Sequence, residues 1–337
     1  LWSSEGLPTV TVTFKEFYLS AREAAKVLAS NGVQRNSRVA FYAENSVEFL
    51  KFSFGALFLG AVPVNFNWRQ PKKILAGCFQ LANCDFLLCS ALYRDKAIYV
   101  AKQNNKENAL FFLENLARAD SSELPDFEEH HAEGDEIACV FFTSGSTKAP
   151  KGVPHTHDEL IWLSEQYLRH LDGGEVPKGS GSLCLFPFFH VMGYVHNMLY
   201  NLYSGMFVVI HRETATAKIT TQLMLQACDQ LKPTVINTVP WIVENFCAML
   251  QSGDPAVRAL DCVVYMSYGG AALPDYCVPI LEKYNIKAMM SYGQTELGAA
   301  IMFTKRGGSL LGMKLFEGVT YELITDDGDP CPADSRQ

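Results

Sequence analysis

Short apolar runs of strand length alternate with amphipathic segments of helical period along most of the 337-residue chain. This alternation is typical of α/β folds, in which helices cover the faces of a mostly parallel sheet. In the first third, helices are expected at residues 14–30, at residues 46–60 with Ser46 as the N-cap, and from Pro71 onward. Strands are expected between them at residues 38–42, 61–65 and 85–89. The pattern therefore predicts a parallel sheet between helical layers.

A second alternating series begins at Ile137, after an acidic stretch at residues 119–136 that reads as a linker with a solvated surface. Thr156 and Glu159 have the spacing of a capping box, so a helix is expected to begin there. Further strands are expected at residues 137–142, 183–186, 206–211, 234–238, 262–266 and 287–290. We expect a first α/β subdomain at residues 1–134, a second at 135–310, and the start of an antiparallel unit at 311–337.

Composition narrows the class of protein. The chain carries 36 acidic and 28 basic side chains, a formal net charge of −8, so we expect no nucleic-acid partner. The ten cysteines form no C-x-x-C pair and are expected to be reduced thiols of the core, not zinc ligands. The longest uncharged apolar stretch, residues 52–64, is shorter than the roughly 20 residues that a membrane span needs. We expect a cytoplasmic enzyme, with a peroxisomal location as the alternative.

The strand expected at residues 137–142 leads directly into a loop rich in small, hydroxyl and lysine residues. The loop reads Thr143-Ser144-Gly145-Ser146-Thr147-Lys148-Ala149-Pro150-Lys151-Gly152. Small residues let backbone N–H groups turn toward an anion, hydroxyls add donors, and lysine supplies the opposite charge. The Walker pattern fails here, because Pro150 stands where it requires glycine and no Ser or Thr follows Lys151. The loop is therefore expected to bind phosphate in another way; a plain polar surface loop is the alternative.

Two further motifs follow this loop in a characteristic order. They are Gly269-Gly270-Ala271-Ala272-Leu273 and Ser291-Tyr292-Gly293-Gln294-Thr295-Glu296. With the loop, they make the chain resemble the adenylate-forming enzymes, which include acyl-CoA synthetases, 4-coumarate:CoA ligases, luciferases and peptide-synthetase adenylation domains. The resemblance covers residues 13 to about 328. It implies the large N-terminal domain of that α/β fold: two helix-covered, mostly parallel sheets and the start of a small antiparallel unit, without the C-terminal lid domain.

The resemblance also implies a reaction, in which a carboxylate attacks the α-phosphate of ATP and the acyl group then passes to coenzyme A, with Mg²⁺ as the metal. Thr295 matches the residue that contacts the α-phosphate, and Glu296 matches the carboxylate that holds Mg²⁺. Thr143, Ser144, Gly145, Ser146, Thr147 and Lys151 match the phosphate loop, and Lys151 is also expected to act in catalysis. Tyr292, with Gly293 after it, matches the aromatic beside adenine, and Gly269, Gly270 and Ala271 match the wall on its other side.

A further segment indicates the kind of acid. Pro187-Phe188-Phe189-His190-Val191-Met192-Gly193 resembles the segment whose histidine lies near the acyl carboxylate, which gives His190 a catalytic role. Its aromatic neighbours, together with Trp241, favour a fatty or aryl acid as the small-molecule substrate. Peptide synthetases place an aspartate in the following helix to bind an amino group, and residues 196–199 contain no acid.

Two departures keep alternatives open. Lys148 stands where the family carries glycine, and Met290 stands where many relatives carry Asn or Gln. A catalytically lapsed nucleotide- or ligand-binding homologue therefore stays a possible reading, and a luciferase-like oxygenase is another. Because the relatives' catalytic lysine belongs to the lid domain, we expect residues 1–337 alone to be nearly inactive.

Overall fold

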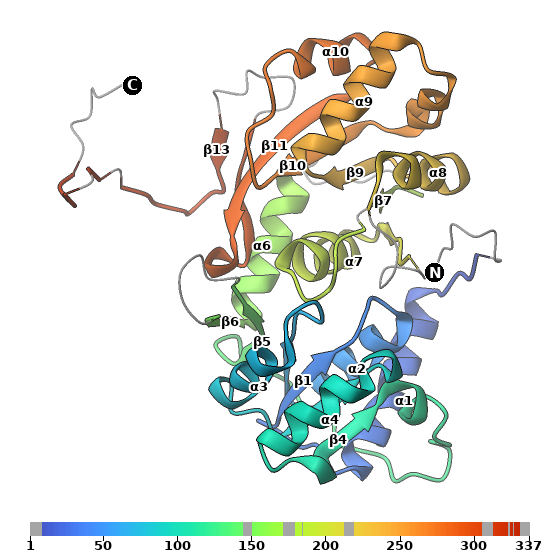
Figure 1. Cartoon of the computed structure of the whole chain (residues 1–337), viewed down its shortest axis with the longest axis vertical. Coiled ribbons are helices and arrows are strands. Elements are labelled where there is room, and N and C mark those ends of the chain that lie inside the picture. The colour runs from blue at the N-terminus through green and yellow to red at the C-terminus, as the bar shows by residue number, and fades with distance from the viewer. Residues whose placement is uncertain are drawn as a thin grey trace.

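The computed structural model describes residues 9–143, 150–170, 179–183, 185–211, 219–304, 313–322, 324–325 and 327–330. These residues form two β-sheets with helices on their faces, which confirms the expected α/β class. Figure 1 shows the first sheet in the lower half of the molecule and the second in the upper half.

The first sheet has six strands in the order β4-β3-β1-β2-β5-β6. All neighbours run parallel except β5 and β6, which form an antiparallel hairpin. Its strands are β1 (Arg38–Tyr42), β2 (Val62–Asn65), β3 (Phe86–Cys89), β4 (Leu110–Phe112), β5 (Ile137–Phe142) and β6 (Gly152–Thr156). Its helices are α1 (Phe14–Ser30), α2 (Val47–Phe58), α3 (Lys72–Leu81), α4 (Arg94–Gln103) and the short α5 (Leu113–Leu116), with single 3₁₀ turns at Ala91–Tyr93 and Glu107–Ala109.

Alternation along β1 shows how this sheet is covered. Val39 and Phe41 belong to the core shared with α1 and α2, whereas Ala40 and Tyr42 belong to the core under α3 and α4. Successive side chains of a strand point to opposite faces, so each face of the sheet buries one set. Helix α1 can lie close to α2 because Gly55 has no side chain: a Cβ there would lie 2.9 Å from the carbonyl oxygen of Ala21.

The expected helix starts are confirmed by their caps. Thr13 and Glu16 form a reciprocal capping box at the start of α1, and the Ser46 hydroxyl accepts from the Phe49 N–H at the start of α2. Helix α6 begins after Thr156, whose hydroxyl accepts from the Glu159 N–H. Each cap satisfies an N–H group that the helix itself leaves without a partner.

The second sheet has seven strands in the order β13-β12-β11-β10-β9-β7-β8. They are β7 (Gly181–Leu183), β8 (Phe207–Val208), β9 (Val235–Thr238), β10 (Tyr265–Gly269), β11 (Lys287–Gln294), β12 (Ala299–Thr304) and β13 (Met313–Leu315). Helices α8 (Thr221–Leu231), α9 (Pro240–Ser252), α10 (Cys277–Lys283) and the 3₁₀ helix η5 (Pro255–Cys262) form one core with one face of this sheet. The other face packs on α6 (His157–His170), the π-helix η4 (Met192–Leu199) and α7 (Tyr200–Ser204).

Several boundaries in this half differ from the expected ones. The strand expected at residues 262–266 begins at Tyr265, because η5 occupies the residues before it. The strand expected at residues 287–290 continues to Gln294, because it turns back into the antiparallel β12. Antiparallel pairing thus begins before residue 311. Within the described part of residues 311–337, β13 pairs antiparallel with β12, and Ile324 forms an isolated antiparallel bridge with Pro330.

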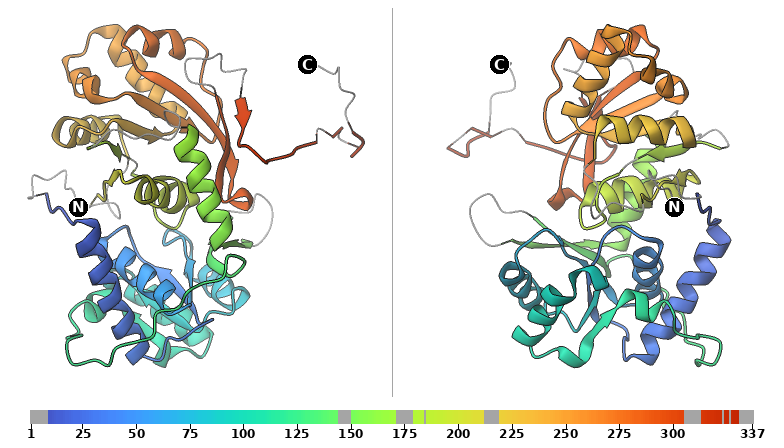
Figure 2. Two further views of the ribbon diagram at one scale, coloured as in Figure 1. Left: turned by 180° about the vertical axis from the view of Figure 1, so that it is seen from behind. Right: turned by 45° about the vertical axis from the view of Figure 1, so that its right-hand side comes forward.

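Helix α6 joins the two halves. It begins beside β6, where the His157 N–H donates to the Glu136 carbonyl, and ends where the His170 ring lies 4.7 Å from that of Phe303 in β12. Figure 2 shows this helix running from one sheet to the other. Sheet membership also crosses the division expected between residues 134 and 135, since β5 and β6 belong to the first sheet. The proposed domain boundaries stay a prediction.

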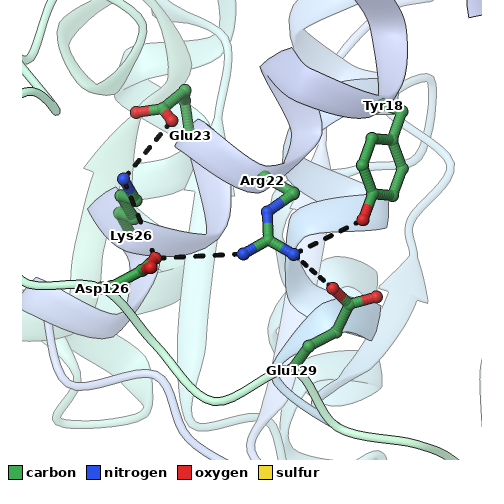
Figure 3. A network of polar contacts seen from close by, with 6 residues as sticks. All are labelled: Tyr18, Arg22, Glu23, Lys26, Asp126 and Glu129. Carbon is green, nitrogen blue, oxygen red and sulfur yellow. Dashed lines mark hydrogen bonds and ion pairs between the residues drawn. The ribbon is translucent and has the colours of Figure 1, made fainter. Parts of the chain in front are cut away.

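The acidic stretch at residues 119–136 is more firmly held than a solvated linker. Arg22 of α1 donates to the Glu129 carboxylate at 2.5 Å and lies 3.9 Å from Asp126 (Figure 3). Its Cζ also lies over the Phe127 ring, 5.2 Å from the centroid. Farther along, the His130 N–H donates to the Phe58 carbonyl. The stretch therefore docks on α1 and α2 although it forms no regular element.

Burial explains the cysteines. Eight of them lie in the described residues, all are free thiols, and seven are buried, as expected for reduced core residues. Burial raises the pKa of Cys78 to about 11 and that of Cys247 to about 12, so both stay protonated at neutral pH. Within the described ranges, no three His, Cys, Asp or Glu side chains gather as a metal site. None of the helices described is both long and apolar enough to cross a membrane.

Candidate functional site

A cleft of about 890 Å³ lies between the two sheets and brings together residues from distant motifs. The expected site residues that line it are Thr143, Lys151, His190, Gly269, Gly270, Gly293, Thr295 and Glu296. Ser144, Gly145, Ser146 and Thr147 lie outside the described residues, as does Lys148. Tyr292, half exposed, and Ala271 are not among the lining residues, so their contact with adenine stays a prediction.

The two ends of the phosphate loop are held together by a hairpin. Phe142 of β5 faces Gly152 of β6, and the Thr143 N–H donates to the Lys151 carbonyl at 3.0 Å. The loop therefore closes between antiparallel strands, whereas a Walker loop runs from a strand into a helix. Lys151 is exposed at the cleft and has no acidic partner among the residues described. Its ammonium group is available to an anion.

A glycine pair forms the opposite wall. Gly269 ends β10 and lies in register with Ser291 of β11, where a Cβ would stand 2.6 Å from the serine Oγ. Gly270 follows with φ +87°, a conformation that side chains disfavour. Both positions therefore require glycine, one for close approach and the other for backbone conformation. Together they leave a wall of bare backbone on this side of the cleft.

Thr295 and Glu296 lie at the tip of the β11–β12 hairpin. They form a three-residue 3₁₀ turn with Leu297, and Gly298 then reverses the chain with φ +73°. Gly293 permits the hairpin to close, because a Cβ on it would lie 1.8 Å from the Ala299 carbonyl oxygen. A turn of three residues has almost no helix macrodipole. Stabilisation of a helix N-terminus therefore does not explain why a carboxylate stands at position 296. Glu296 is exposed and is among the residues that line the cleft.

His190 stands on the tight loop before η4. Its backbone N–H donates to the Pro187 carbonyl, and its ring Nδ1 accepts from the Met192 N–H at 3.1 Å. The ring is open to the cleft, yet the surrounding protein atoms reduce its hydration and lower its pKa. His190 is therefore neutral at pH 7, and since Nδ1 is an acceptor, the proton is on Nε2. A neutral imidazole N–H is a suitable donor for a carboxylate oxygen.

The cleft also has an apolar part next to His190. It is lined by Phe186, Phe189, Val191, Met192, Val239, Ala299 and Ala300. Trp241 is half exposed on α9 and is not among the residues that line the cleft, so its part in binding the acid stays a prediction. The apolar wall is suited to a hydrocarbon or aromatic body joined to the carboxylate.

Sequence reasoning missed the residues that the first sheet contributes. Phe66, Asn67, Arg69 and Gln70 line the cleft from the loop after β2. Arg69 lies over the Trp68 ring at 4.6 Å and over the Phe189 ring at 5.8 Å. Their position directly after a parallel strand could have predicted this, because ligands bind at the carboxyl ends of such strands.

The residue types fit Mg·ATP. Hydroxyl and ammonium groups at Thr143 and Lys151 can contact phosphate oxygens, and the Glu296 carboxylate is the kind of ligand that Mg²⁺ prefers. The glycine wall lets a planar base approach the backbone. The lining thus combines polar groups of the kind that bind a nucleotide with an apolar wall in one cleft.

Comparison with known proteins agrees with this geometry. The sequence matches the family described as AMP-binding enzyme over residues 7–336. It is 25% identical to the long-chain-fatty-acid–CoA ligase FadD13 of Mycobacterium tuberculosis over 85% of this chain and 55% of that protein. It is also 25% identical to the 2-succinylbenzoate–CoA ligase of a Geobacillus strain over 86% of this chain and 54% of that protein. The chain spans about half the length of these curated relatives.

Solved structures show the same fold. The O-succinylbenzoate coenzyme A synthetase of Bacillus subtilis in complex with AMP superposes with a TM-score of 0.81 at 20% identity, covering 97% of this chain and 80% of that chain. The N-terminal domain of FACL13 from Mycobacterium tuberculosis superposes with a TM-score of 0.80 at 20% identity, covering 96% of this chain and 80% of that one.

Proposed function

Since this chain belongs to the AMP-binding enzyme family, we propose that it forms the nucleotide- and acid-binding part of an ATP-dependent acid–thiol ligase. The enzyme would convert an apolar carboxylic acid, fatty or aryl, to an acyl-adenylate and pass the acyl group to coenzyme A. One observation carries this proposal: a single cleft joins the ends of the phosphate loop, the Thr295-Glu296 turn, the glycine wall and His190 beside an apolar wall.

In the first step, a carboxylate oxygen attacks the α-phosphorus of ATP, and the bond from that phosphorus to the bridging oxygen breaks as pyrophosphate leaves. Thr143 and Lys151 would hold the departing phosphates, and Thr295 would contact the α-phosphate. Glu296 would hold Mg²⁺, which supplies positive charge to the phosphate oxygens when bound. Since no bond to the protein forms, these residues act by positioning and by neutralising charge.

His190 is assigned to the acid. Its neutral ring would donate the Nε2–H to one carboxylate oxygen and leave the other free to attack, while the apolar wall buries the body of the acid. The relatives act, by their names, on a long-chain fatty acid and on succinylbenzoate. The lining of this cleft favours the same broad class of apolar acid.

Nucleotide binding is the direct test. In isothermal titration calorimetry, Glu296→Gln should weaken Mg·ATP binding by at least about tenfold, roughly 1.4 kcal/mol, because it removes a charge next to the divalent cation. Glu282→Gln serves as the matched control, since Glu282 is exposed on α10 and does not line the cleft. It should leave the affinity unchanged.

Two other outcomes would change the conclusion. Equal Mg·ATP affinity in the wild type and in Glu296→Gln would remove Glu296 from the metal site. Tight nucleotide binding by a full-length protein that forms no acyl-adenylate with any fatty or aryl acid would instead favour the catalytically lapsed homologue.

A further inference from the structure

Asn45 bonds to the backbone of the loop that carries His190, although 141 to 143 positions separate them in sequence. Its side-chain Nδ2–H donates to the Phe186 carbonyl at 2.8 Å, and its Oδ1 accepts from the Phe188 N–H at 2.7 Å. In a β-sheet, a neighbouring strand would form hydrogen bonds with these two backbone groups. Asn45 is buried, with 4% of its surface exposed, and follows the carboxyl end of β1.

The segment held in this way forms part of the cleft. Phe186, Pro187, Phe189 and His190 all line it, whereas Asn45 does not. The bond from Asn45 to Phe188 lies two residues before His190, and the His190 N–H is in turn bonded to the Pro187 carbonyl. A change at Asn45 is therefore expected to act on the cleft through this segment.

We propose that Asn45 is a positioning residue, which sets the places of His190 and Phe189 in the cleft by tying their loop to the end of β1. Only a side chain with a donor and an acceptor at the amide spacing satisfies both backbone groups. Aspartate keeps the acceptor and loses the donor, and leucine of similar size loses both. The inference rests on the proposed function for the acid-binding role of His190, but the position of the ring can be tested without any ligand.

A second contact between the same two halves provides the control. The Ser53 hydroxyl of α2 and the Tyr194 hydroxyl of η4 lie 2.7 Å apart, and both residues are buried. Ser53→Ala removes this contact between α2 and η4 but leaves the bonds to Phe186 and Phe188 intact. This variant therefore measures the effect of weakening the contact between the two halves without changing the bonds of Asn45.

The first measurement is the NMR titration of the His190 ring, assigned by comparison with His190→Gln. In Asn45→Leu the ring should move away from the protein atoms that reduce its hydration, so its pKa should rise from the lowered value toward the ordinary one. Ser53→Ala should leave the titration as in the wild type. An unchanged titration in Asn45→Leu, or the same change in Ser53→Ala, would overturn the proposal.

Acid binding is the second measurement. In the presence of Mg·ATP, Asn45→Leu should weaken binding of the preferred acid at least about tenfold, because a small displacement of a positioned group is costly. The affinity for Mg·ATP itself should change by less than about twofold, since the nucleotide contacts lie elsewhere in the cleft. Equal losses for both ligands would contradict a positioning role. If the wild type binds no acid, the proposed function fails, and the His190 titration still decides the role of Asn45.

Hydrogen exchange covers the case in which Asn45→Leu does not fold. In the wild type, the Phe188 amide should exchange as slowly as the amides of β1, because its acceptor, Asn45 Oδ1, is buried with it. Asn45→Asp keeps this acceptor and should retain much of the protection. Rapid exchange of the Phe188 amide in the wild type would overturn the proposal.

Discussion

The buried histidine His196 makes the stability of this protein depend on pH. His196 lies in η4 with no exposed surface, its Nε2 is 3.2 Å from the Asn237 Oδ1, and the rings of Tyr167 and Tyr200 lie about it at 5.0 and 5.2 Å. Burial lowers the pKa of His196 to about 4, while the bond to Asn237 opposes this shift weakly. The folded protein therefore resists protonation at this position.

We expect the free energy of unfolding to fall as the pH falls below 6.5. The unfolded chain binds a proton on His196 near pH 6.5, and the folded chain does so only near pH 4, so acid favours unfolding throughout that window. The loss from His196 between pH 7 and pH 5 should be about 2 kcal/mol. Urea unfolding at both pH values measures it. His196→Gln should reduce the loss of stability between pH 7 and pH 5 by about 2 kcal/mol, and the exposed His131→Gln is the control. An equal loss in all three proteins would contradict the assignment.

At the scale of elements, α1 is more than a cover for the first sheet. It carries Arg22, which bonds to Tyr18 and Glu129 and stacks on Phe127, so one side chain connects the helix to a segment over 100 positions away. Figure 3 shows that Asp126 also contacts Lys26 of the same helix. The contact network explains why an acidic stretch without regular structure is ordered.

Arg22→Ala should therefore release this segment. We expect a loss of about 1 to 2 kcal/mol in the free energy of unfolding, from one cation–π contact and a partly buried ion pair. The His130 amide, bonded to the Phe58 carbonyl, should exchange faster with solvent. Lys15→Ala, an exposed change on the same helix, is the control and should affect neither quantity. Unaltered exchange of the His130 amide in Arg22→Ala would show that other contacts hold the stretch.

At the scale of the whole molecule, one core runs through both sheets. The same cluster of buried apolar residues contains Phe41 and Phe49 from the first half and Tyr194, Met289 and Phe303 from the second. When one half unfolds, the part of the shared core that belongs to the other half becomes exposed to water. They are therefore expected to unfold together.

Coincident unfolding can be measured with tryptophan fluorescence. Trp68 lies beside the first sheet and Trp241 lies on α9 of the second. Variants that retain only Trp68 or only Trp241, with the other three of the four tryptophans replaced, should show urea midpoints that agree within error. Two separated midpoints would indicate independently folding units, which would support a boundary between subdomains of the kind expected near residue 134. The inactivity expected for residues 1–337 alone stays a separate prediction.

The sequence alone determined the features that depend on neighbours within a turn or two. The capping-box spacing at Thr156 predicted the start of α6, and an apolar run predicted β5 at its observed bounds. The order of the phosphate loop, the glycine pair and the Tyr292-to-Glu296 motif was enough to identify the family. These signals are local because caps, periodicity and turn residues act over short distances along the chain.

Tertiary structure decided everything that depends on distant partners. It placed β5 and β6 in the first sheet, paired Gly269 with Ser291, and turned β11 back into β12 at the tip that carries Glu296. It also brought Asn45 to the loop of His190, a contact with no trace in the local pattern. The physical reason is that hydrogen bonding across strands and packing between helices depend on which distant surfaces meet, and periodicity along the chain specifies only that each surface exists.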